Sequence, residues 1–132
     1  MPDILIVEDN QVNQKLIAFL LARAGFTYDM AENGAVALQK LAAESYRLVL
    51  MDIMMPVMNG YDATRAIRND PRLKHLPIVA LTANAMRGEE ERCRAAGCDD
   101  FIAKPYSKDV VLATISRLLD PPSGGRLAAP EA

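Results

Sequence analysis

Residues 48–52, Leu48-Val49-Leu50-Met51-Asp52, form a short apolar run that ends in a carboxylate. Four similar runs flank it, and successive runs begin 23, 21, 30 and 23 residues apart. Each interval can hold a strand, two loops and a helix of roughly 11–12 residues. Continuously apolar runs are typical of parallel strands that are buried on both faces, whereas the alternating second run predicts a strand nearer an edge. The predicted strands span residues 4–7, 27–30, 48–51, 78–81 and 101–103.

Helical patterns occupy the intervals between the predicted strands. In the first helix, apolar residues share one wide face that we expect to pack in the core, and Gly25 ends the helix. The residues of this face are Val12, Leu16, Ile17, Phe19, Leu20 and Leu21. Further helices are predicted over residues 34–41, 61–67, 84–96 and 110–119.

Five units of this size favour an open, doubly wound α/β sheet, because a closed barrel of eight units needs about 250 residues. The string Asp120-Pro121-Pro122-Ser123-Gly124-Gly125 follows the last helix and breaks regular structure. We therefore expect one domain over residues 1–119 and a flexible tail over residues 120–132. A tail of this length is too short to form an output domain.

The composition limits the classes of partner. The chain has 132 residues, and 15 Lys+Arg against 17 Asp+Glu give a formal net charge of −2. This balance argues against nucleic acid as a partner, because nucleic-acid affinity depends on many cations that neutralise phosphates. The absence of a long apolar stretch and of a signal peptide indicates a cytoplasmic protein that does not bind membranes. Cys93 and Cys98 fit neither a C-x-x-C redox pair nor a zinc site, so we expect structural roles for both.

Polar residues follow four of the predicted strands: Glu8-Asp9, Asp52, Thr82 and Lys104. The carboxyl ends of parallel strands meet at one edge of a sheet, and ligands bind there in folds of this class. Any one of these residues could be an ordinary solvated strand end, but three clustered carboxylates repel one another and favour a bound cation. Oxygen ligands suit Mg²⁺, which binds carboxylates together with phosphate oxygens. Because a carboxylate can also accept phosphorus as a nucleophile, the pattern predicts Mg²⁺-dependent phosphoryl transfer.

Four motifs resemble the signature of response-regulator receiver domains, which are also called CheY-like domains. They are Val7-Glu8-Asp9-Asn10, the string LMDIMMPVMNG at 50–60, Leu81-Thr82-Ala83 and Ile102-Ala103-Lys104-Pro105. The similarity covers roughly residues 3–119, and its motifs particularly resemble DivK-like regulators and the receivers of hybrid histidine kinases. It implies a five-stranded parallel sheet in order 2-1-3-4-5 and phosphorylation of one aspartate by a two-component histidine-kinase system.

The resemblance implies a role for each matching residue of the site. Asp52 matches the aspartate that is phosphorylated. Asp9 matches a direct Mg²⁺ ligand, and Glu8 matches an acid that acts on the metal largely through water. Asp52 and the backbone carbonyl of Met54 match further ligands, and Lys104 matches the lysine that pairs with the aspartate or its phosphate.

Two more positions match a conformational switch in the family. Thr82 matches the hydroxyl that moves to bond the phosphoryl group, and Phe101 matches the aromatic residue that turns inward at the same time. Many relatives have tyrosine in place of Phe101. Because phenylalanine has no hydroxyl, recognition of this residue by a partner would depend on the position of its ring.

The resemblance also implies the partners. A histidine kinase or a histidine phosphotransfer protein would donate the phosphoryl group and dock partly on the first helix, with Asn13 and Gln14 at the rim. A downstream protein would bind the surface made by the fourth helix, the fifth strand and the fifth helix. The charged face of the fourth helix could equally be an ordinary solvated surface. We expect a monomer or a weak homodimer.

Two other functions are compatible with parts of the pattern. A phosphohydrolase of the haloacid-dehalogenase type also uses a strand-end aspartate and Mg²⁺, but it needs a second acid two residues later, where this chain has Met54. A scaffold with a degenerate site would not be phosphorylated, but this chain has all the signature residues. The sequence therefore predicts a receiver that is not a true enzyme and catalyses only its own phosphoryl transfer and dephosphorylation.

Overall fold

The computed structural model describes residues 2–53, 58–82, 88–103 and 107–119. In this part of the chain, strands and helices alternate along the sequence. The strands are β1 (Ile4–Val7), β2 (Tyr28–Ala31), β3 (Leu48–Asp52), β4 (Ile78–Thr82) and β5 (Asp100–Ala103). The helices are α1 (Gln11–Arg23), α2 (Gly34–Ala43), α3 (Gly60–Arg68), α4 (Glu89–Ala96) and α5 (Lys108–Leu118).

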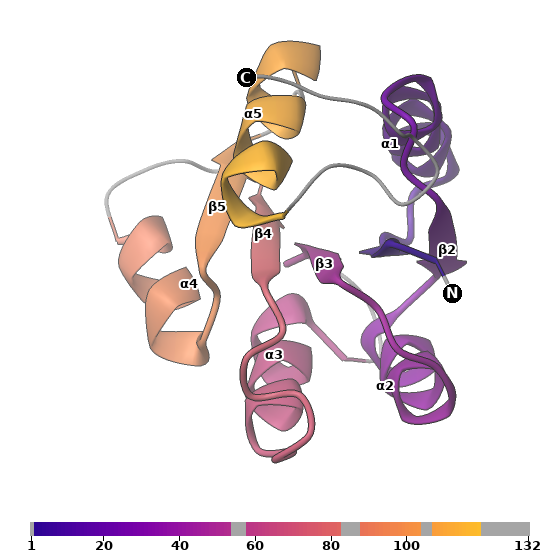
Figure 1. The fold of residues 1–132 in the computed structure, drawn as a ribbon. Helices are drawn as coiled ribbons and strands as arrows, with labels where there is room; N and C mark the ends of the chain where they lie inside the picture. The colour runs from indigo at the N-terminus through magenta and orange to yellow at the C-terminus, as the bar shows by residue number, and fades with distance from the viewer. Residues whose placement is uncertain (1, 54–57, 83–87, 104–106, 120–132) are drawn as a thin grey trace.

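The five strands form one parallel sheet in the order β2-β1-β3-β4-β5 (Figure 1). This topology confirms the predicted α/β fold class and strand order. In the middle of the sheet, Val7 of β1 lies opposite Ala31 of β2 on one side and Met51 of β3 on the other. The strand with the alternating pattern, β2, lies at an edge as predicted.

Helices cover both faces of the sheet, and successive side chains of each strand point alternately into two cores. On the face covered by α1 and α5, the buried helix residues are Ile17, Leu20, Leu21, Val111 and Ile115. On the face covered by α2, α3 and α4, they are Ala37, Leu41, Tyr61, Ala63, Ile67, Cys93 and Ala96. The strands β1, β3 and β4 are buried at every residue, which explains their almost continuously apolar sequences.

The predicted packing of α1 is wrong for half of its apolar residues. Ile17, Leu20 and Leu21 are buried against the sheet, but Val12, Leu16 and Phe19 are 74%, 38% and 58% exposed. The two sets point in directions about 130° apart around a helix of 3.6 residues per turn. A flat sheet covers only one side of a helix, so the second apolar stripe faces solvent.

The predicted helix over residues 84–96 is also wrong at its start. α4 begins at Glu89, and Gly88 before it has φ +98°, which a right-handed helix does not allow. Residues 84–87 lie outside the described part of the chain. At its other end α4 stops at Gly97 with φ +117°, so this end agrees with the prediction.

A buried acid joins the residues that immediately precede three strands, at the edge of the sheet far from their carboxyl ends. Asp3 is 1% exposed, and its carboxylate accepts hydrogen bonds from Arg47 Nη1 at 3.0 Å and from the backbone N–H of Thr27 at 3.0 Å. Asp3 precedes β1, Thr27 precedes β2 and Arg47 precedes β3. The contact therefore fixes the starting register of these strands.

Among the described residues, none of the helices has the length and apolar character needed to cross a membrane.

Candidate functional site

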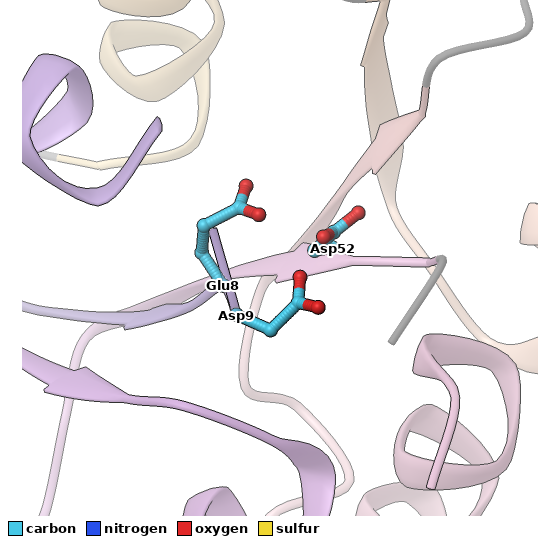
Figure 2. Close-up of side chains that lie close together, drawn as sticks. All are labelled: Glu8, Asp9 and Asp52. Atoms are coloured by element: carbon cyan, nitrogen blue, oxygen red, sulfur yellow. The ribbon is translucent and has the colours of Figure 1, made fainter. Parts of the chain in front are cut away.

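Three carboxylates meet at the carboxyl edge of the sheet, as the strand ends predict. Asp52 is the last residue of β3, and Glu8 and Asp9 follow β1, its neighbour in the sheet. Figure 2 shows the three side chains gathered where these strands end. One carboxylate oxygen from each lies within 4.8 Å of the others, with Glu8 and Asp52 buried and Asp9 exposed. The site is thus open to solvent on the side of Asp9.

The backbone around Asp52 is held on two sides. The N–H of Ile53 donates to the carbonyl of Leu81 in β4 at 3.1 Å, and the N–H of Gly60 donates to the carbonyl of Ile53 at 3.0 Å. A Cβ atom at Gly60 would collide with the carbonyl oxygen of Asp52 and would lie 2.8 Å from Ile53 Cα. Only glycine allows the start of α3 to approach the acid so closely.

The turn that carries the other two acids is attached to its neighbours by hydrogen bonds. The N–H of Glu8 donates to Ala31 of β2 at 3.0 Å, and the Nε2 amide of Gln14 donates to the carbonyl of Glu8 at 2.5 Å. Asn10 caps α1 by accepting a bond from the N–H of Asn13 at 3.0 Å, which satisfies one of the free donors at the helix start.

The donor set fits a hard divalent cation. All three side chains offer oxygen, and their close approach in a partly buried site creates mutual repulsion that a bound cation relieves. Magnesium takes oxygen ligands in octahedral geometry and keeps several waters, which the open side at Asp9 would allow. The residues present are therefore compatible with Mg²⁺.

Thr82 and Phe101 lie on neighbouring strands, and Thr82 is close to the carboxyl edge. Thr82 ends β4 and is 2% exposed, opposite Ala103 of β5. Phe101 lies opposite Ala80, two residues before Thr82, so the two side chains share one face of the sheet. Phe101 is half-buried against the core beneath α2, α3 and α4.

Two of the expected site residues, Lys104 and Met54, lie outside the described part of the chain. The sequence identified the three acids and Thr82 because each stands at a strand end. The glycine at position 60, after the strand and its acid, also predicts a helix start or turn that needs close backbone approach, and the structure confirms this. The sequence indicated Gln14 only as a residue at the rim of a docking surface. Its contact with the carbonyl of Glu8 depends on how α1 packs against the site, and no local pattern encodes that.

Comparisons with known proteins agree with the geometry. The family model described as the response regulator receiver domain matches residues 4–116. The polar-differentiation response regulator DivK of Brucella anthropi is 39% identical over 116 residues, which cover 88% of this chain and 94% of that protein.

Solved structures show the same fold. The receiver domain of sensor histidine kinase PA1611 from Pseudomonas aeruginosa, which has a magnesium ion in its active-site cleft, gives a TM-score of 0.83 at 38% identity, covering 89% of this chain and 96% of that one. The receiver domain of Ssk1 from Saccharomyces cerevisiae, crystallised with the histidine phosphotransfer protein Ypd1, gives a TM-score of 0.82 at 28% identity, covering 89% of each chain.

Proposed function

This chain belongs to the response regulator receiver domain family of two-component systems, and on that basis we propose that Asp52 is the residue that accepts the phosphoryl group. One observation carries the proposal: Asp52 is a buried strand-end carboxylate with oxygens of Glu8 and Asp9 within 4.8 Å. The same membership places the chain among receivers and not among haloacid-dehalogenase phosphohydrolases.

In the proposed reaction, an Oδ atom of Asp52 attacks phosphorus, the bond from phosphorus to the donor atom breaks, and an acyl phosphate forms. Asp9 and Asp52 would hold Mg²⁺ directly, with Glu8 acting through water and Met54 offering its backbone carbonyl. The cation would neutralise charge on the transferring group, as magnesium does in phosphoryl transfer generally. Lys104 would pair with Asp52 and later with its phosphate.

The phosphorylated state would differ from the free state through Thr82 and Phe101. A phosphoryl group adds negative charge and acceptor oxygens at Asp52, and the hydroxyl of Thr82 is a donor on the next strand. If Thr82 moves toward the phosphate, it leaves room on the face of the sheet that it shares with Phe101, and the ring of Phe101 would turn inward to fill that room. The altered surface would be that of α4, β5 and α5, where a downstream protein would bind.

The exposed apolar stripe of α1 is the surface that we assign to the phosphodonor. The stripe begins at Val12, close in sequence to the acidic turn, and runs along α1 through Leu16 to Phe19. At Phe19 a cavity of about 360 Å³ continues the surface toward Lys108 and Leu112 of α5. A histidine kinase or histidine phosphotransfer protein presents helices, and an apolar stripe suits helix packing. The Ssk1 receiver, crystallised with Ypd1, supports a partner of this class.

The remaining parts of the proposal concern the whole chain. Residues 1–119 would form the receiver domain, and the tail predicted over residues 120–132 lies outside the described part of the chain. The protein would act in the cytoplasm as a monomer or weak homodimer. Its only catalysis would be its own phosphorylation and dephosphorylation.

Mass spectrometry after incubation with acetyl phosphate and Mg²⁺ tests the acceptor. We expect a gain of about 80 Da, one phosphoryl group, on the peptide that contains Asp52. Asp52→Asn and wild type with excess EDTA are the controls, and neither should gain this mass. An unmodified wild-type protein, with Asp52→Asn equal to wild type in partner binding, would support a degenerate scaffold instead.

A further inference from the structure

A single side chain of α1 reaches back to the turn that carries two of the acids. The Nε2 amide of half-buried Gln14 donates to the backbone carbonyl of Glu8 at 2.5 Å. Gln14 is six residues beyond Glu8 in the sequence. Its contact is with the backbone of the turn.

The carbonyl that Gln14 holds determines the direction of the chain into Asp9. The carbonyl of Glu8 and the N–H and Cα of Asp9 belong to one planar peptide unit. Fixing the orientation of that carbonyl therefore fixes the line along which Asp9 leaves the turn. On the other side of Asp9, the carbonyl of Asn10 accepts the N–H of Gln14 at 2.9 Å in the first turn of α1.

Asp9 is the acid that most needs such support. Glu8 is 0% exposed and Asp52 is 1% exposed, so packing restricts both side chains, whereas Asp9 is exposed. An exposed carboxylate also moves with its backbone unless that backbone is held, and this freedom is lost when the carboxylate binds a cation. Gln14 therefore holds the peptide unit that precedes Asp9 through its side chain, while its backbone N–H holds the unit between Asn10 and Gln11, one further along the chain.

We propose that Gln14 is a positioning residue for the divalent-cation site, presetting Asp9 through the carbonyl of Glu8. This inference rests on the proposed function, since it assumes that Glu8, Asp9 and Asp52 bind Mg²⁺. Gln14 does not touch the cation or the phosphoryl group. It acts as residues that orient metal ligands do elsewhere, by reducing the disorder that binding must remove.

Isothermal titration calorimetry with MgCl₂ tests the proposal on the full chain. Gln14→Met keeps the length and helix propensity of the side chain but removes the donor, so it should fold like wild type. We expect its Mg²⁺ affinity to fall about 10-fold, the lower end of the usual effect of losing a group that orients a ligand. The matched control is Gln11→Met, the same change at an exposed glutamine of the same helix, which should bind like wild type.

The rate of phosphorylation by acetyl phosphate, measured across Mg²⁺ concentrations, separates positioning from general damage. For Gln14→Met the Mg²⁺ concentration at half-maximal rate should rise by the same factor as the dissociation constant. The maximal rate at saturating Mg²⁺ should stay within about twofold of wild type, because Asp52 is unchanged. A proportional fall in the maximal rate, with the half-saturating concentration unchanged, would overturn the proposal.

The failures of the two hypotheses are distinguishable. If wild type binds Mg²⁺ and Gln14→Met binds it equally well, the role of Gln14 is wrong and the proposed function stands. The same conclusion follows if Gln11→Met is weakened as much as Gln14→Met. If wild type itself binds no Mg²⁺, the proposed function is contradicted and the positioning role falls with it.

Discussion

The hydroxyl of Tyr46 is a buried polar group outside the site. Tyr46 is 8% exposed, and its hydroxyl donates to Asp29 Oδ2 at 2.6 Å, joining the segment before β3 to β2. Burial, together with this bond and the negative charge of Asp29, raises the pKa of Tyr46 above the ordinary value of 10.0. The neutral hydroxyl is the form that the folded protein stabilises.

The shift gives a pH dependence with a definite sign. Because the folded pKa of Tyr46 is raised, its contribution to stability is complete below pH 10.0 and is lost as the pH rises through the folded pKa. Tyr46→Phe should be less stable than wild type by about 1 kcal/mol at neutral pH, since it lacks the hydrogen bond. Urea unfolding of both proteins from neutral pH to pH 11 should show that difference shrinking above pH 10.0. A constant difference across this range would show that the hydroxyl does not titrate as described.

Cys98 behaves as an apolar residue of the core. It is 6% exposed beside Thr64, and burial raises the pKa of its thiol to about 12. At neutral pH almost none of it is the reactive thiolate. This environment agrees with the structural role expected for both cysteines.

At the scale of elements, the strands were predictable and the surface of α1 was not. The runs at Ile4–Val7 and Leu48–Met51 are apolar at every position because both faces of those strands are covered. Such a pattern indicates a buried strand directly. In α1, apolar residues surround more than half of the helix. The sequence does not show which side of the helix meets the sheet. It therefore predicts a core position for Val12 as well as for Ile17, although only Ile17 is buried.

The exposed stripe of α1 leads to a prediction that separates two kinds of phosphodonor. Changing Val12 and Leu16 together to glutamine should alter the free energy of unfolding by only about 0.5 kcal/mol, because both side chains are already exposed. Phosphorylation by acetyl phosphate should be unchanged. Transfer from a cognate histidine phosphotransfer protein should slow at least about 10-fold, because docking energy is lost.

Rates with both donors, measured by loss of phosphate from the protein donor and by mass spectrometry with acetyl phosphate, check this prediction. The control is Lys74→Gln, the removal of a charge from an exposed residue that lies before β4 and outside α1. Equal transfer rates for the double variant and wild type would assign the stripe to another partner.

At the scale of the whole molecule, the sheet brings together residues that are far apart in sequence. Glu8, Asp9 and Asp52 could be predicted to meet because parallel strands end at one edge, and the structure places them there. The support that Gln14 gives them was not predictable, since it depends on how α1 docks, whereas the glycine at position 60 already indicated a close backbone approach after Asp52. Local sequence identifies strand ends, whereas the exact placement of a helix depends on the complete packed core.

If the acidic cluster binds Mg²⁺, the cation should stabilise the entire fold. A ligand present at about 100 times its dissociation constant adds roughly 2.7 kcal/mol, which raises the melting temperature of a domain of this size by roughly 10 °C. Thermal unfolding with MgCl₂ should show this rise, and Asp9→Asn should show much less of it. KCl at matched ionic strength is the control, and an equal rise with KCl would indicate screening instead of binding.

The parallel sheet also has a consequence for how the chain folds. No two neighbouring strands are joined by a hairpin, and the contacts of Asp3 span 24 residues to Thr27 and 44 residues to Arg47. Each pairing must close a long loop before it gains any contact, and such topologies fold more slowly than helical bundles of equal stability. During synthesis, β1 is made first but cannot become a central strand until β3 has been made. The three acids therefore meet only after much of the sheet has assembled, and cation binding is a property of a nearly complete fold.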